Sequence, residues 1–232
     1  AYGIYVQSPF PKENRRILIG SDVSSRYTRR NRAEYRKIAG YIARCVWQRQ
    51  GNYMVFFPSY RLMEDVLQVY EEEFSVDWVR CVCQTPDMTE QEREGFLEEF
   101  QEREGTLVGF CVLGGIFSEG VDLTGESLIG AVIVGTGLPQ IGSQREILKE
   151  YYDKKNHCGF DYAYRYPGMN KVLQAAGRVI RTKEDKGVIL LLDDRFWDRD
   201  YQEIFPREWQ DRTGCRLDTV EGAVETFWKR FT

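Results

Sequence analysis

The residues best suited to chemistry lie in the stretch QAAGRVIR at positions 174–181. On a helix at about 100° per residue, one narrow stripe would hold Gln174, Gly177, Arg178 and Arg181. The remaining positions are mostly apolar, so we expect the rest of this helix to be buried. Arginine presents a planar, permanently charged fork to phosphate oxygens. The stripe therefore predicts an anion clamp, and the alternative is a surface helix with two solvated arginines.

A second candidate site is the glycine-rich stretch GGIFSEGVDLTG at 114–125, which follows the apolar run 106–113. Loops at the carboxyl ends of parallel strands are where α/β folds bind ligands. The polar and glycine positions of interest are Gly114, Ser118, Glu119, Gly120 and Asp122. We favour a binding loop here over a plain glycine-rich turn, although this pattern alone is not specific.

Two further segments combine features of nucleic-acid contact. Arg29 and Arg30 belong to a basic concentration that begins at Arg26 and runs into a helix expected over 31–50. Such charges either bind phosphates or form a solvated face. The long stretch 135–167 interleaves tyrosines with lysines and arginines, which suits base stacking. The alternative for that stretch is an excursion packed on the domain surface.

The surrounding elements alternate between apolar strands and helices. We expect strands at 16–19, 53–57, 77–82, 106–113, 128–134 and 187–192, and helices at 31–50, 59–74, 89–104 and 172–181. Ser59 is a predicted cap, Thr89 to Glu92 form a capping-box pattern, and an edge strand is expected near 217–220. The pattern predicts an α/β fold in three layers, with a mostly parallel sheet and helices on both faces, as one domain over 1–232.

Composition narrows the class of protein. Of the 232 residues, 42% are hydrophobic and 29% are charged, which is typical of a soluble globular chain. No run of 18 apolar residues is present, so we expect no membrane span. The six cysteines form no C-x-x-C pair, which favours reduced, mostly buried thiols and a cytoplasmic location. The net charge of −4 still permits a local basic patch.

Three stretches in order resemble the second RecA-like motor domain of superfamily 2 helicases of the XPD/DinG group. QAAGRVIR at 174–181 is similar to helicase motif VI, GGIFSEGVD at 114–122 to motif V, and VFFPSY at 55–60 to motif IV. VQSPF at 6–10 and DRF at 194–196 also fit this group. The resemblance extends over nearly the whole chain.

The resemblance implies a role for each matching residue. Arg178 and Arg181 would approach the ATP γ-phosphate between two motor domains, with Arg181 as arginine finger and Gln174 in support. Motif V would line the nucleotide site, with Asp122 at the ribose. Ser59 and Tyr60 would lie near single-stranded DNA.

The chain also lacks parts that such an enzyme needs. No G-x-x-x-x-G-K-[ST] loop and no acidic box for Mg²⁺ occurs in the sequence. In the family both lie on the first motor domain, as do the iron–sulfur cysteines of many members. We therefore expect a fragment of a longer helicase that uses ATP with Mg²⁺, partners its first motor domain and is inactive alone. The competing hypothesis is a non-catalytic α/β nucleic-acid-binding module.

Overall fold

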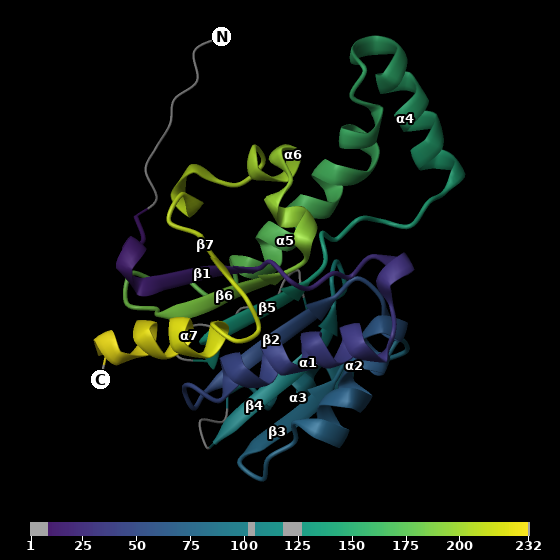
Figure 1. Ribbon diagram of the computed structural model, residues 1–232. Helices are drawn as coiled ribbons and strands as arrows, with labels where there is room; N and C mark the ends of the chain where they lie inside the picture. Colours follow the sequence, from purple (N-terminus) through teal and green to yellow (C-terminus); the bar gives the residue numbers. More distant parts are fainter. Residues whose placement is uncertain (1–8, 102–104, 118–126, 232) are drawn as a thin grey trace.

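Seven parallel strands form one sheet in the computed structural model, which describes residues 9–101, 105–117 and 127–231 (Figure 1). The strand order is β3-β4-β2-β5-β6-β1-β7. The strands are β1 (Arg15–Gly20), β2 (Asn52–Phe57), β3 (Val79–Cys83), β4 (Thr106–Val112), β5 (Gly130–Val134), β6 (Gly187–Leu192) and β7 (Thr213–Cys215). The predicted α/β class and parallel sheet are thus confirmed.

The central strands are buried on both faces, which explains their continuous apolar runs. Successive side chains point to opposite faces of the sheet. In β2, Val55 and Phe57 enter one core cluster, whereas Met54 and Phe56 enter the other. The two cores lie between the sheet and a helical layer on each side, as the three-layer prediction requires.

The first helical layer contains α1 (Arg32–Val46), α2 (Tyr60–Glu73) and α7 (Val220–Trp228). Asn31 caps α1 by accepting a hydrogen bond from the backbone N–H of Glu34. Ser59 caps α2 in the same way through the N–H of Leu62, which confirms the predicted cap. Helix α1 is shorter than predicted because the chain turns after Val46.

The opposite layer contains α3 (Glu90–Glu98), α5 (Tyr166–Ala176) and the short α6 (Arg199–Gln202). The capping box of Thr89 and Glu92 is present at the start of α3. The expected edge strand at 217–220 is wrong: the edge strand is β7, and Val220 already begins α7. β7 has three residues and includes Gly214, too short for an alternating pattern to reveal.

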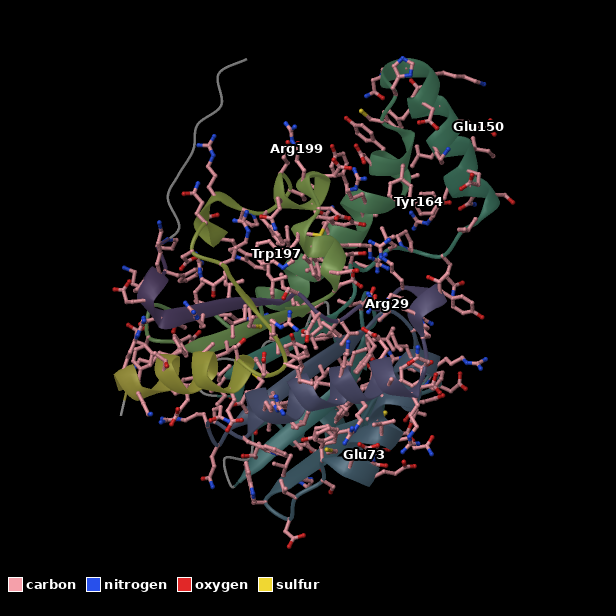
Figure 2. All side chains as sticks on the ribbon, viewed as in Figure 1. Arg29, Glu73, Glu150, Tyr164, Trp197 and Arg199 are labelled. Carbon is pink, nitrogen blue, oxygen red and sulfur yellow. The ribbon has the colours of Figure 1, made fainter. Side chains whose placement is uncertain are left out.

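A helical arm projects from the domain between β5 and α5 (Figure 1). It consists of α4 (Ser143–Asn156) and a π-helical segment (Asp161–Arg165) that continues into α5. Figure 2 labels Glu150 and Tyr164 on this arm. From the sequence, only an aromatic excursion is predicted here; in the structure none of the α4 residues is buried.

Some of the aromatic residues of the arm contact other residues of the arm. The rings of Tyr152 and Tyr162 stack at 4.0 Å, and Tyr164 is buried and donates a hydrogen bond to Glu146. Tyr151, by contrast, is 55% exposed beneath the ammonium of Lys155. Surface packing therefore accounts for some of these rings, and base stacking stays a prediction for the others.

No helix among the described residues has the length and apolar character needed to cross a membrane.

Candidate functional site

The helix that carries the QAAGRVIR stretch ends earlier than its sequence predicts. Helix α5 stops at Ala176, so Gln174 lies on its last turn while Arg178 and Arg181 lie beyond it. The N–H groups of Arg178 and Val179 bond to carbonyls three residues back, at 3.2 and 3.3 Å, which tightens the chain into a turn. The predicted helical stripe over 172–181 is therefore wrong in its second half.

Two features end this helix. Val179 and Ile180 are both buried in the core cluster on this face of the sheet, which holds the chain against the domain after the helix ends. Asp185 then fixes the following turn. Its carboxylate accepts from the N–H of Arg181 at 2.8 Å and from the N–H of Thr182 at 2.7 Å. Asp185 is 7% exposed, so these bonds are shielded from water and hold the backbone of Arg181 in place.

The predicted residues nevertheless meet in one hollow. A pocket of about 620 Å³ is lined by Phe10, Gln174, Gly177, Arg178, Ile180, Arg181 and Thr182. Gly177 is exposed there, so its missing side chain leaves the backbone accessible. Two guanidinium groups and an amide beside an open backbone can bind a phosphate group through charge-assisted hydrogen bonds.

A larger hollow of about 1180 Å³ lies beside the turn at Glu184–Lys186 and is lined in part by Trp47, Trp78 and Trp228. Its cations lie over aromatic rings: Arg49 over Trp228 at 5.5 Å, and Lys186 over Phe231 at 4.5 Å. We therefore assign the phosphate chemistry to the smaller hollow, which both Arg178 and Arg181 line.

The glycine-rich stretch is described only in its first part. Gly114 has φ of +71°, a left-handed conformation that favours glycine, and lies in the turn two residues after the end of β4. Ser118, Glu119, Gly120 and Asp122 lie outside the described residues, so their nucleotide-binding role stays a prediction. The position of Gly114 at a carboxyl strand end agrees with a ligand-binding edge.

Ser59 and Tyr60 lie at the same edge, after β2. The Ser59 hydroxyl accepts from the N–H of Leu62 as the α2 cap, so one of its functions is structural. The Tyr60 hydroxyl accepts a hydrogen bond of 2.9 Å from the amide of Gln84, whose side-chain oxygen accepts from the N–H of Val112 at 2.9 Å. Gln84 is 3% exposed. Its role is not predicted from the sequence, because it belongs to no recognisable motif.

Arg29 and Arg30 are held by neighbours within the domain. Arg29, labelled in Figure 2, contacts the carboxylates of Glu34 at 3.2 Å and Asp194 at 3.6 Å. Arg30 donates to the carbonyl of Ser25 and lies over the ring of Tyr27. The charge of Arg29 is thus largely balanced, and a DNA contact by this pair stays a prediction.

A buried ion pair at the end of β6 fixes the loop that carries these arginines. Asp193 is fully buried and accepts from the Ser25 N–H at 2.9 Å, the Ser25 hydroxyl at 2.6 Å and the Arg195 Nε at 2.7 Å. Burial alone would raise the pKa of Asp193, but its hydrogen bonds and charge pairing with Arg195 and Ser25 lower that pKa below its ordinary value. No local sequence pattern predicts this network, because Ser25 lies 168 residues before Asp193.

The described residues contain no group of three His, Cys, Asp or Glu side chains that could hold a metal ion. The six cysteines are free thiols, of which Cys45, Cys111 and Cys215 are buried. Cys81, Cys83 and Cys158 are partly exposed, so the expectation of mostly buried thiols holds for half of them.

Known proteins are similar to this chain in sequence and in fold. Residues 42–212 match the helicase C-terminal domain family. A probable ATP-dependent helicase of Methanocaldococcus jannaschii is 29% identical over 206 residues, 84% of this chain and 31% of that protein. The ATP-dependent DNA helicase XPD of Sulfolobus acidocaldarius is 30% identical over 189 residues, 77% of this chain and 31% of that protein. A solved XPD helicase structure matches with a TM-score of 0.68 at 24% identity, over 87% of this chain and 35% of that one.

The three-layer parallel fold is that of a RecA-like helicase domain. The chain belongs to the helicase C-terminal domain family, in the XPD/DinG-like group of superfamily 2. It spans 31% of the length of each of the two relatives above.

Proposed function

We propose that this chain is the second motor domain of an ATP-dependent DNA helicase, which couples ATP hydrolysis to movement along DNA and its unwinding. The observation that carries the proposal is the hollow that gathers Gln174, Arg178 and Arg181 in a chain of this family. In the proposal these residues complete an ATP site whose phosphate loop lies on a first motor domain, elsewhere in a longer polypeptide.

The role proposed for each residue follows from its chemistry. Arg178 and Arg181 can neutralise charge that grows on the transferred phosphoryl group, and Gln174 can orient them by hydrogen bonding. Mg²⁺ would be held by carboxylates of the first motor domain, where it would neutralise phosphate charge. Motif V would bind the nucleotide through Gly114, Ser118, Glu119, Gly120 and Asp122, and single-stranded DNA would lie across Ser59, Tyr60, Arg29 and Arg30.

The proposal predicts that the isolated chain binds ATP weakly and does not hydrolyse it. Arginines can stabilise a transition state only when the nucleotide, its metal ion and the attacking water are held against them. Phosphate release by the chain alone should equal the buffer background, with and without single-stranded DNA. Turnover by the isolated chain that disappears in Arg178→Ala would overturn the proposed division between two domains.

The proposal also predicts weak, salt-dependent binding of single-stranded DNA. Phosphate contacts release counterions, so the association constant should fall as salt rises. Changing Arg29 and Arg30 together to Gln should lower affinity and flatten this salt dependence, measured by anisotropy of a labelled oligonucleotide. Changing Arg32 and Arg36 together to Gln is the matched control, because it removes the same charge from two exposed arginines of α1 that are paired with Glu72 and Glu73. Equal affinities of the double variant and wild type would remove Arg29 and Arg30 from the DNA site.

A further inference from the structure

A lysine side chain lies across the first glycine of motif V. Lys171 is on α5, and a Cβ placed on Gly114 would be 2.7 Å from its Cε and 2.8 Å from its Nζ. Real Cβ atoms do not approach other atoms so closely, so any other residue at Gly114 would displace the lysine. The left-handed backbone favours glycine at this position, and the absence of a side chain leaves room for the flexible end of Lys171 to lie against it.

Among the described residues, the ammonium of Lys171 has no carboxylate partner. Within the described part of the chain, Lys171 forms no ion pair and no hydrogen bond, and it is half-buried. Arg29 and Arg165, by contrast, are paired: Arg29 with Glu34 and Asp194, and Arg165 with Asp161 and Asp200. A half-buried lysine without a counter-charge has lost part of its hydration. Its electrostatic attraction for an anion is therefore stronger than that of a lysine on an open surface.

Polar groups continue from Lys171 toward the DNA-binding residues of motif IV. A Cβ on Gly115 would lie 3.1 Å from the amide nitrogen of Gln84, and that amide holds the hydroxyl of Tyr60. Lys171, Gly114, Gly115, Gln84 and Tyr60 thus form one connected edge at the ends of β2 and β4, which we call the β4 edge. The β4 edge thus contains the Lys171 ammonium, which lies close to the backbone of Gly114, and the side chain of Tyr60.

We propose that Lys171 binds a phosphate of the nucleic-acid backbone as the strand crosses the β4 edge. This inference rests on the proposed function and adds to it a residue outside the three helicase motifs. Lysine acts on phosphate as a point charge and needs no fixed fork geometry, which suits a backbone that moves past the site.

A nucleotide phosphate shares this chemistry and is the other source to consider. Lys171 precedes Gln174 by three residues on α5, so the two share a face of the helix. Lys171 is not, however, part of the hollow that holds Arg178 and Arg181. Its close neighbours belong to the β4 edge, which leads to Tyr60, and this favours nucleic acid over nucleotide.

The test compares Lys171→Gln with Lys229→Gln in this chain. Lys229 is an exposed lysine on the far side of the sheet from α5, so its substitution changes the net charge equally. The probe is a fluorescein-labelled deoxythymidine 20-mer, titrated at several salt concentrations. We expect Lys171→Gln to raise the Kd about 3- to 10-fold and to reduce the slope of log K against log salt by about 0.7, the value for one phosphate contact on a single strand. Lys171→Arg keeps the charge and should retain most of the affinity.

The outcomes separate the two proposals. An unchanged Kd and salt slope in Lys171→Gln, with wild type binding normally, would overturn the role of Lys171 alone. Wild type without salt-dependent binding would overturn the proposed function and this inference with it. In a parallel titration with a fluorescent ATP analogue, we expect equal affinities for wild type and Lys171→Gln. A loss confined to that analogue would reassign Lys171 to the nucleotide and contradict the inference.

Discussion

Arg181→Ala in the longer polypeptide is expected to lower DNA-stimulated ATP hydrolysis by at least ~10²-fold, toward the scale of known arginine fingers. The guanidinium would meet negative charge that grows on the γ-phosphoryl oxygens in the transition state. An interaction that is stronger in the transition state than in the ground state acts mainly on kcat. Arg181→Lys should recover little activity, since lysine keeps the charge but loses the planar fork.

Folding should barely change in these variants. The backbone of Arg181 is held by the carboxylate of Asp185, a contact that does not use the arginine side chain. Steady-state ATPase and thermal unfolding should therefore be measured together for wild type, Arg181→Ala and Arg181→Lys. Normal turnover in Arg181→Ala would defeat the clamp interpretation. Lost turnover together with a large drop in Tm would show instead that the arginine is structural.

The strands were the most predictable part of the fold. Each central strand is a short apolar run. A strand that is covered on both faces needs apolar residues at successive positions, regardless of which strands pair with it. The run at 53–57 predicts β2 almost to the residue, and the one at 187–192 predicts β6 to the residue. Helix α4 was not predicted, because it projects from the domain and buries none of its side chains.

The candidate site was predictable in its residue types and less so in its backbone. QAAGRVIR indicated an anion clamp, yet a periodic pattern cannot show where Ala176 ends the helix. That end depends on the carboxylate of Asp185 and on the burial of Val179 and Ile180, which are tertiary contacts. Contacts such as Lys171 on Gly114 join elements 57 residues apart, so no local pattern reveals them.

The second large effect is expected at Asp193, the buried carboxylate at the end of β6. Asp193→Ala leaves Arg195 without its ion-pair partner, and Ser25 loses the acceptor of its N–H and hydroxyl. Breaking a buried ion pair by removing one partner costs about 3–5 kcal/mol. For a domain of this size that corresponds to a fall in Tm of about 6–20 °C.

Asp194→Ala is the matched control, because the neighbouring carboxylate is partly exposed. Its ion pairs with Arg26 and Arg29 lie at the surface, where such pairs contribute less than about 1 kcal/mol. Unfolding by heat and by urea should therefore separate the two substitutions clearly. Equal destabilisation by Asp193→Ala and Asp194→Ala would show that burial of the Asp193–Arg195 pair does not matter for folding.

The pH dependence of stability gives an independent check on the charge of Asp193. Its folded-state pKa is lowered, so its contribution to stability is complete above the unfolded pKa of about 4 and is lost as pH falls through the folded value. Asp193→Asn has a similar shape but no charge to titrate. The difference in unfolding free energy between wild type and Asp193→Asn should thus be constant near neutral pH and should shrink below about pH 4. A difference that is independent of pH down to the acid transition would mean that shape and hydrogen bonding, rather than the ion pair with Arg195, hold the loop of Ser25 against β6.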